Sequence, residues 1–228
     1  MPVSIWNGME DCLAVIVGCR PAAALDAGAG FGLWGCLLRQ YLDVWSGRLE
    51  REQWATRIDA VEMDSARVQP HARHLYTDIV IGDVREVVPR RAVEVRYDVI
   101  LFGDVIEHLP KDDGIRLLEQ SARLATRLVV VRIPLGDGWR REGREEPDHH
   151  RSRWYAEDLR GRSFGGHLAR VREYDFLGNP YGLVTIATGE DSVAPDPDVA
   201  QHAGEDQRDS IEARLDRLER RLERLVAP

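Results

Sequence analysis

The sequence predicts an α/β protein with a doubly wound, mostly parallel sheet, and three observations support this fold class. Short apolar segments alternate with longer amphipathic ones between about residues 20 and 188. The short segments are apolar throughout, as in strands that are buried on both faces of a parallel sheet. Their β-α-β-α order is typical of sheets that carry helices on both faces.

The strands and helices follow from this alternation. The parallel strands are expected at Ala22–Ala27, Ile58–Glu62, Ile79–Ile81, Asp98–Phe102 and Leu128–Ile133. The helices between them are expected at Phe31–Leu42, Ser65–Leu75 and Asp112–Arg127. Two later strands, His167–Tyr174 and Gly182–Ala187, have no helix between them, so they predict an antiparallel hairpin at one edge of the sheet.

Composition excludes several classes of function. The chain has 228 residues, enough for one domain and a short extension. Its net charge of -8 makes nonspecific capture of nucleic acid by the whole surface an unfavourable hypothesis. Lys111 is the only lysine and lies in Leu-Pro-Lys-Asp-Asp, which excludes a phosphate-binding loop that ends in Gly-Lys-Ser/Thr.

Cysteine usage and the absence of targeting signals indicate a cytoplasmic protein. Cys12, Cys19 and Cys36 are odd in number and lack metal-ligand spacing, so reduced thiols are expected. No signal peptide is recognisable, because acidic residues interrupt the start of the chain. The apolar run at 13–17 is too short to span a bilayer, so no contact with membranes is expected.

The chain is expected to consist of a domain over 1–188, a linker over 189–209 and a helix over 210–228. The linker is acidic and rich in Pro and Gly, which predicts disorder. The helix has a heptad seam, with apolar residues at Ile211, Leu215, Leu218, Leu222 and Leu225. A short coiled coil that forms a homo-oligomer is the leading interpretation; docking onto the domain or onto another protein is the alternative.

A glycine-rich turn carries the main chemical signal. Ala24-Leu-Asp-Ala-Gly-Ala-Gly-Phe-Gly32 ends a predicted buried strand and opens a helix, whose free N–H groups can face a ligand. A dinucleotide-binding turn would need a glycine where Leu33 stands. The pattern Asp-x-Gly-x-Gly-x-Gly instead resembles the first motif of class I S-adenosylmethionine-dependent methyltransferases, in which this loop surrounds the amino-acid end of the cofactor.

Later strand ends match the same family in the same order. Glu62 ends the second strand, and the resemblance implies that it accepts both ribose hydroxyls, with Asp64 as the reserve candidate. Asp83 follows the third strand, where the family contacts the adenine amino group. Tyr97–Leu109 matches the fourth strand and the turn after it. The resemblance implies S-adenosylmethionine as cofactor, a seven-stranded Rossmann-like sheet, and cofactor contacts from Asp26, Gly28, Gly30, Phe31, Gly32, Glu62, Met63, Asp83, Val84 and Asp104.

One segment is longer than the family's spacing allows. The excess falls at 43–57 and contains Trp45 and Trp54. We expect an additional helical excursion that shields the cofactor or forms an interface. Simple packing of both tryptophans on the domain is an equal alternative.

Two sets of residues are candidates for the chemistry. Asp104, Glu107 and His108 have i, i+3, i+4 spacing, which puts them on one face of a helical turn and would suit a divalent ion such as Mg²⁺. The pattern resembles Glu-x-x-Glu-His of metal-assisted O-methyltransferases. Family members without a metal share Glu-His-Leu here, so capping or pocket-lining is favoured and no metal ligand is assigned.

The second set lies in the irregular segment 134–154. Asp148–Trp154 resembles a His-x-Ser-x-Trp segment that lies over the acceptor side in bacterial members of the superfamily. His149 or His150 is expected to take a proton from the acceptor, with His108 as a further catalytic candidate. Arg151 and Arg153 either bind an anionic acceptor or are ordinary surface charges.

These patterns lead to three hypotheses. The first is an S-adenosylmethionine-dependent methyltransferase that methylates an oxygen of a small molecule, sugar or glycan. The second is a metal-assisted RNA 2′-O-methyltransferase, which the acidic composition disfavours. The third is a non-catalytic α/β scaffold that recruits a partner through its C-terminal helix.

Overall fold

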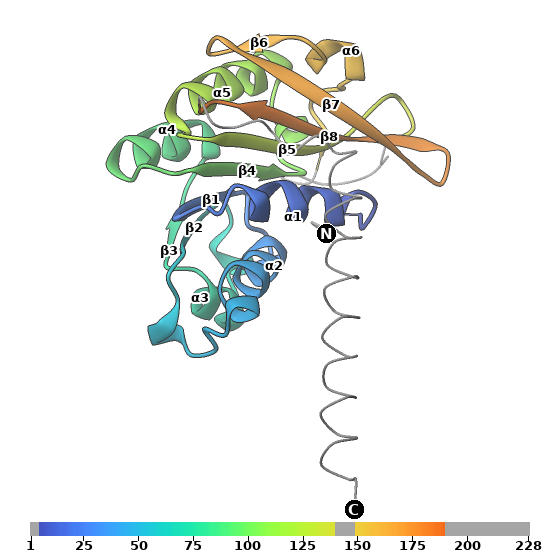
Figure 1. Ribbon diagram of the computed structural model, residues 1–228. Coiled ribbons are helices and arrows are strands. Elements are labelled where there is room, and N and C mark those ends of the chain that lie inside the picture. Colours follow the sequence, from blue (N-terminus) through green and yellow to red (C-terminus); the bar gives the residue numbers. More distant parts are fainter. Residues whose placement is uncertain (1–4, 140–148, 190–228) are drawn as a thin grey trace, which may run out of the picture. The chain divides into compact units, whose positions relative to one another are not determined.

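The computed structural model describes residues 5–139 and 149–189. Its sheet has eight strands in the order β3-β2-β1-β4-β5-β8-β7-β6 (Figure 1). The first five strands of the chain run parallel: β1 (Ala23–Ala27), β2 (Arg57–Glu62), β3 (Asp78–Ile81), β4 (Val99–Gly103) and β5 (Leu128–Pro134). The predicted doubly wound sheet and its five parallel strands are therefore confirmed.

The remaining strands form an antiparallel edge. β7 (His167–Phe176) and β8 (Asn179–Ala187) form the predicted hairpin, and β8 also pairs with β5. β6 (Ser163–Phe164) pairs with β7 and was not predicted. The expected count of seven strands is therefore wrong, because a strand of two residues is too short to show any periodicity.

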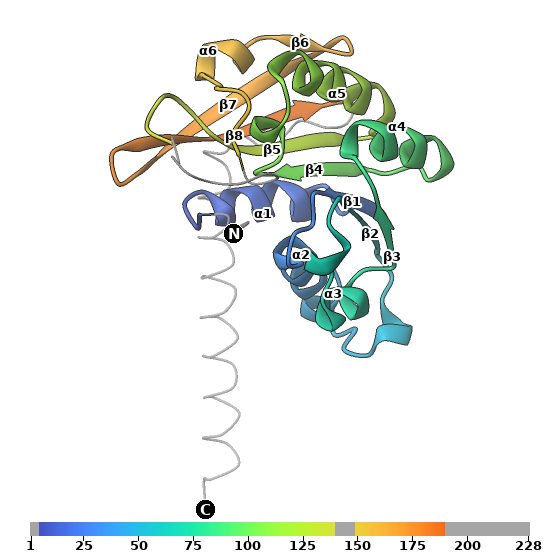
Figure 2. The same cartoon turned by 180° about the vertical axis from the view of Figure 1, so that it is seen from behind.

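Helices cover both faces of the sheet. α1 (Met9–Gly18), α2 (Leu33–Leu42) and α3 (Pro70–Leu75) lie on one face, and α4 (Val84–Glu94) and α5 (Lys111–Leu124) lie on the other (Figures 1 and 2). The helix α6 (Ala156–Leu159) precedes β6. Short 3-10 turns complete the structure: η1 (Val44–Ser46), η2 (Arg51–Gln53), η3 (Ser65–Arg67) and η4 (Ile106–His108).

Several helices differ from the expectation. The single helix expected at Ser65–Leu75 is instead η3 followed by α3, because Gln69 precedes Pro70 and is therefore extended, with ψ 164°. The helix α4 was not predicted, since Pro89 and many charged residues obscure its apolar stripe.

The core lies on both faces of the sheet because successive strand residues point to opposite sides. On β4, Val99 and Leu101 pack with α1 and α2, whereas Ile100 and Phe102 pack with α4 and α5. Every residue of β1, β4 and β5 is buried. Full burial of such a side chain stabilises the fold by about 1.5–3 kcal/mol. The central strands therefore hold the residues at their carboxyl ends in fixed positions.

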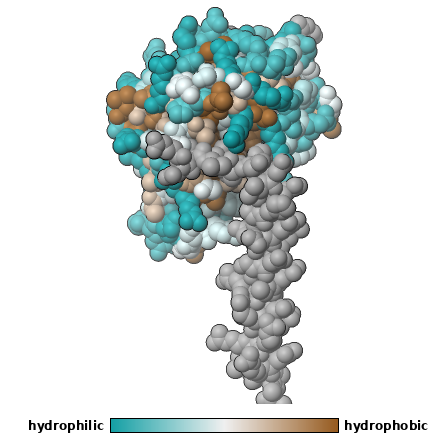
Figure 3. All heavy atoms as spheres, turned by 45° about the horizontal axis from the view of Figure 1, so that its top comes forward, coloured by the Kyte–Doolittle hydropathy of each residue, from teal (hydrophilic) through white to brown (hydrophobic). Residues whose placement is uncertain are grey.

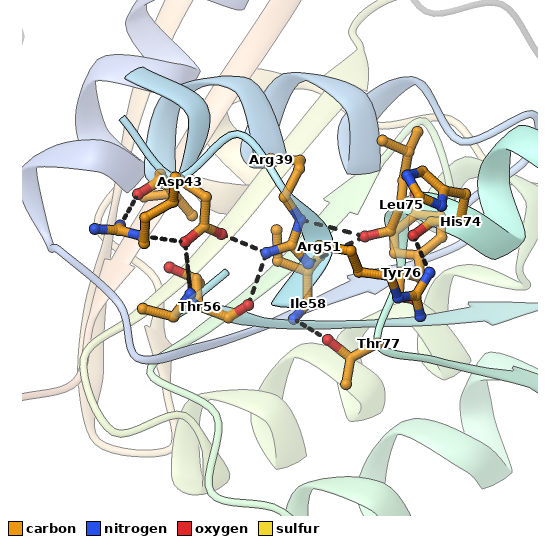
Figure 4. A network of polar contacts seen from close by, with 12 residues as sticks. Arg39, Asp43, Arg51, Thr56, Ile58, His74, Leu75, Tyr76 and Thr77 are labelled. Carbon is orange, nitrogen blue, oxygen red and sulfur yellow. Dashed lines mark hydrogen bonds and ion pairs between the residues drawn. The ribbon is translucent and has the colours of Figure 1, made fainter. Parts of the chain in front are cut away.

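The segment 43–57 is held to the domain by a buried ionic network (Figure 4). Asp43 is 0% exposed and accepts hydrogen bonds from Arg39, Arg48 (2.8 Å) and the amide of Ala55 (2.8 Å). Arg39 also donates to the carbonyl of Thr56 at 2.8 Å. The predicted excursion is thus helical only in the single turns η1 and η2.

The two tryptophans of this segment differ. The ring of Trp54 lies 4.0 Å from the Arg39 guanidinium and contacts His74 edge-on at 5.4 Å. Trp45 is 66% exposed and contacts Tyr41. Packing on the domain therefore accounts for Trp54, and it leaves Trp45 available at the surface.

The predicted linker and heptad helix lie outside the described residues, except for Gly189. In the described part of the chain, no helix combines the length and the apolar character that crossing a membrane requires. The face in Figure 3 is mainly hydrophilic, with hydrophobic side chains in small patches. All three cysteines are free thiols, as expected.

Candidate functional site

The carboxyl ends of the parallel strands bring the predicted cofactor residues to one edge of the sheet. Ala27 on β1 is paired with Val61 on β2, and Glu62 is paired with Ile81 on β3. The glycine turn, Glu62 and Asp83 therefore follow three neighbouring strands at the same edge. In α/β sheets of this kind, ligands bind outside the carboxyl ends of the strands.

The glycine turn after β1 has a backbone that side chains would disturb. Gly28, Gly30 and Gly32 have φ of 102°, 53° and 88°, in the region that favours glycine. A Cβ on Gly28 would lie 2.4 Å from Cγ2 of Val105. The amide of Gly28 donates to the carbonyl of Val61 at 2.8 Å, which fixes the turn to β2.

Glu62 supports this turn from the next strand. Its Oε2 accepts a hydrogen bond from the amide of Gly30 at 2.7 Å, and its Oε1 accepts one from the amide of Asp64 at 2.9 Å. Asp64, the reserve candidate, caps η3 through the amide of Ala66. The geometry thus links Glu62, and not Asp64, to the glycine turn. Each carboxylate oxygen has a second lone pair for a ligand hydroxyl.

Asp26 lies beneath the turn with one oxygen unsatisfied. The hydroxyl of Tyr76 donates to Oδ2, whereas Oδ1 is buried and has no hydrogen-bond partner among the described residues. Burial raises the pKa of Asp26 to about 7, against the opposing effect of the Tyr76 hydrogen bond. A cationic ligand group would complete this site, so the residues present fit the ammonium of the amino-acid end of S-adenosylmethionine.

The other predicted cofactor residues vary in their surroundings. Phe31 and Met63 are 44% and 55% exposed, so both present apolar surface beside the turn. Asp83 caps α4 and pairs with Arg85, whose hydrogen bonds hold the pKa of Asp83 below its ordinary value. Val84 is buried in the core.

Asp104, directly after β4, has an unusual conformation. Its φ is 56°, which is rare for a residue with a side chain and costs roughly 1–2 kcal/mol. The hydroxyl of Tyr181 donates to Oδ1 at 2.5 Å, and the Asp104 amide donates to the carbonyl of Arg132 at 3.0 Å. These contacts hold Asp104 at the edge between β4, β5 and β8.

A cavity of about 330 Å³ opens beside this edge. It lies after β4 and β5, which are neighbours in the sheet (Figure 1). Its size is within the range of small-molecule sites. Its lining combines aromatic rings with imidazole and charged groups: Glu107, Pro134, Gly136, Asp137, Trp139, His149, His150, Ser152, Arg153 and Trp154.

Two catalytic candidates meet a buried carboxylate next to this cavity. Glu107, His108 and His150 each offer a ligand atom, and these atoms all lie within 4.8 Å of one another. The rings of His108 and His150 are in edge-to-face contact at 5.1 Å. His149 is exposed and lines the cavity but does not belong to this group.

The three-residue set expected from sequence, Asp104 with Glu107 and His108, is not the set found. Asp104 precedes the 3-10 turn η4, and its carboxylate accepts from Tyr181. His150 takes the third position instead. An i, i+3, i+4 argument assumes helical backbone, which the positive φ of Asp104 interrupts.

Glu107 is 1% exposed, and its Oε2 has no hydrogen-bond partner among the described residues. Burial, and secondarily the negative charge of Asp104, raise the pKa of Glu107 well above its ordinary value. Oε1 lies 3.9 Å from Nε2 of His108. A buried carboxylate with one unsatisfied oxygen is costly to the fold, which marks this position as a functional candidate.

Backbone hydrogen bonds fix residues 149–154, which we call the histidine segment, to η4. The amides of Arg151 and Ser152 donate to the carbonyl of Glu107 at 2.9 and 3.1 Å. Trp154 is fully buried, and its Nε1 donates to Oγ of Ser152 at 2.9 Å. Arg153 pairs with Asp137 at 2.8 Å, so its charge is already matched at the cavity wall.

Sequence reasoning missed several polar groups of this edge. Tyr76 donates a hydrogen bond to Asp26, and Tyr181 donates one to Asp104. Their local sequence does not predict these contacts, because each tyrosine lies far from its aspartate in the chain. Arg132 is 0% exposed, lies 4.9 Å from the ring of Tyr181 and donates to the carbonyl of Asn7 at 2.6 Å. A lone arginine in an otherwise apolar strand was a usable signal.

No protein-family model matches the sequence, and no curated protein matches it. Solved structures do match the fold. An O-methyltransferase of Streptomyces achromogenes in complex with S-adenosylmethionine has a TM-score of 0.55 and 15% identity, covering 83% of this chain and 84% of that one. The fold is that of class I S-adenosylmethionine-dependent methyltransferases.

Two further structures agree with the methyltransferase fold. The 1,6-didemethyltoxoflavin N1-methyltransferase of Burkholderia thailandensis has a TM-score of 0.52 and 18% identity, covering 80% of this chain and 77% of that one. Magnesium protoporphyrin IX methyltransferase of Synechocystis PCC 6803 also has a TM-score of 0.52, with 15% identity and coverage of 79% and 83%. Both were solved with S-adenosylhomocysteine bound.

Proposed function

We propose that the protein is an S-adenosylmethionine-dependent methyltransferase that methylates an oxygen of a small molecule or sugar. The observation that carries this proposal is the edge of the sheet after β1 and β2. A glycine turn there is tied to Glu62, and a buried Asp26 oxygen lacks a partner. The methyltransferase fold supports the same cofactor.

The chain's own groups would hold the cofactor by complementary chemistry. Asp26 accepts the ammonium, the amides of the glycine turn face the amino-acid end, and Glu62 accepts ribose hydroxyls. Phe31 and Met63 present the exposed apolar surface that a purine ring can cover. S-adenosylmethionine supplies a methyl group on a positively charged sulfur, which is a good leaving group.

The cavity after β4 and β5 would hold the acceptor in line with that methyl group, and such positioning supplies much of the catalysis. His149 or His150 takes the proton of the acceptor hydroxyl. With the cofactor bound, its methyl group would pass to the acceptor oxygen, and the electron pair of the broken carbon–sulfur bond would remain on sulfur. The aromatic rings of Trp139 and Trp154 favour an acceptor with a flat or apolar face.

Calorimetry with S-adenosylhomocysteine tests the cofactor assignment. The full chain should bind it with 1:1 stoichiometry, and Gly30→Asp should abolish binding by placing a carboxylate in the turn. Glu62→Gln should weaken binding at least about tenfold, because it loses a charge-assisted acceptor. Glu86→Gln alters an exposed carboxylate on α4 and serves as the matched control. Absence of binding to the folded wild-type chain would refute the proposal.

A further inference from the structure

We infer that Glu107, His108 and His150 form a binding site for one divalent transition-metal ion at the wall of the acceptor cavity. The site itself stands on the described residues alone, whereas its role in catalysis rests on the proposed function. The three ligand atoms already lie within 4.8 Å of one another, and Glu107 and His150 line the cavity.

The Glu107 carboxylate is the first argument. It is almost completely buried, yet its Oε2 has no hydrogen-bond partner among residues 5–139 and 149–189. Such a group destabilises the fold when it stays unsatisfied. A cation beside it would supply the missing partner and the missing charge.

The tautomer of His108 is the second argument. Its Nδ1 lies 3.1 Å from the carbonyl oxygen of His149. A carbonyl can only accept, so Nδ1 carries the proton, and the neutral ring has its lone pair on Nε2. That is the nitrogen 3.9 Å from Oε1 of Glu107. Metal-bound histidines typically donate their other ring N–H to a carbonyl or carboxylate in this way.

The distances fit an ion after a small contraction. Nitrogen and oxygen ligands lie about 2.0–2.2 Å from such ions, so two ligand atoms are at most about 4.3 Å apart. Movements of less than about 1 Å therefore close the group around an ion. Backbone bonds from Arg151 and Ser152 to the Glu107 carbonyl hold both parts of the site together during this movement.

The ligand set selects the class of ion. Two imidazoles and one carboxylate suit zinc, cobalt, manganese, iron or nickel, whereas Mg²⁺ prefers oxygen ligands. Three protein ligands leave positions open toward the cavity, as in catalytic sites. An acceptor hydroxyl bound there would lose its proton more readily. This assignment makes His108 and His150 ligands and leaves His149 as the imidazole that takes the proton.

The test uses the full chain after treatment with a chelator, with Co²⁺ as the probe. Calorimetry and the visible absorption of bound Co²⁺ should both show one ion per chain. His150→Gln, His108→Gln and Glu107→Gln should each weaken Co²⁺ binding at least about tenfold. His167→Gln, on β7 outside the cluster, is the matched control and should leave the affinity unchanged. Mg²⁺ should bind at least about tenfold more weakly than Co²⁺.

Three results would overturn the inference: no saturable Co²⁺ binding below about 1 mM, unchanged affinity in His150→Gln and His108→Gln, or equal affinity for Mg²⁺. Binding of S-adenosylhomocysteine is measured on every sample. It shows that a variant is folded, and it separates failure of the metal site from failure of the proposed function. His150 is only half-buried, so its variant decides the question even where Glu107→Gln does not fold.

Discussion

Two buried carboxylates in different regions of the molecule have opposite surroundings. Asp43, at the end of α2, accepts hydrogen bonds from Arg39, Arg48 and two backbone amides. Burial alone would raise its pKa, but these bonds hold the pKa below its ordinary value. Glu107, in η4, is equally buried and has an unsatisfied oxygen, and its pKa is raised. Burial is therefore compatible with either direction of pKa shift, and the hydrogen-bond partners of each carboxylate decide which one occurs.

The largest expected effect comes from replacing each of the two acids, Asp43 and Glu107, by its amide in a separate variant. Asp43→Asn should lower the free energy of unfolding by about 3–5 kcal/mol, because it leaves the buried Arg39 guanidinium without its counter-charge. Glu107→Gln should change it by less than about 1 kcal/mol, since no ion pair of comparable quality is lost. Urea denaturation measures both values. Equal losses for the two variants would contradict the comparison.

The second effect concerns space that the glycine turn keeps free. Gly28→Ala should destabilise the fold by about 1–3 kcal/mol, because the new Cβ meets Val105 and φ is positive. Gly47→Ala is the matched control, since its φ is 82° and nothing lies within 4 Å of the added atom. Thermal unfolding and S-adenosylhomocysteine affinity should both be affected more at Gly28. An equal loss at Gly47 would show that backbone strain alone matters.

A third effect is a pH dependence from Asp26. Its pKa of about 7 in the folded protein exceeds its unfolded value of about 3.9, so the folded protein binds more protons between these values. Its contribution to stability is complete below about pH 4 and is lost as the pH rises through 7, by up to about 1.4 kcal/mol per pH unit. Asp26→Asn should remove this slope, whereas Glu86→Gln should keep it. Urea denaturation at pH 4–8 measures the difference, and parallel curves for wild type and Asp26→Asn would exclude the effect.

The smallest expected effect tests whether the stability of the domain and its S-adenosylhomocysteine affinity depend on the C-terminal segment. Deletion of 205–228 should leave the S-adenosylhomocysteine affinity unchanged and the free energy of unfolding of the domain within about 0.5 kcal/mol. Sedimentation should show fewer chains per particle than for the full chain, because the heptad seam is the predicted oligomerisation element. Loss of S-adenosylhomocysteine binding, or an unchanged number of chains per particle, would contradict this division of roles.

Local patterns made the sheet edge that carries the glycine turn predictable from the sequence. The strand, the glycines after it and Glu62 belong to short segments whose parallel pairing follows from the β-α-β order. A carboxylate close to the turn could therefore be expected without knowledge of contacts between distant parts of the chain. The unsatisfied oxygen of Asp26 was not predictable, because it depends on how Tyr76 packs from α3.

The cavity after β4 and β5 was only partly predictable for a related reason. His108 and His150 were both candidates, but their meeting depends on the path of the chain after β5, which carries no periodicity. The positive φ of Asp104 also removed it from the expected helical face. The two-residue β6 and the proline-containing α4 were missed because short or interrupted elements give weak periodic signals.

The attachment of the histidine segment to η4 has a consequence for how this protein can change over evolution. The bonds that the Arg151 and Ser152 amides make with the Glu107 carbonyl involve main-chain atoms only. Side chains at 149, 151 and 153 can therefore be exchanged without displacing the segment, while Ser152 and Trp154 keep its frame. A mutant library at position 153, which lines the cavity, would vary the chemical preference of the cavity on an unchanged scaffold while His149 is kept.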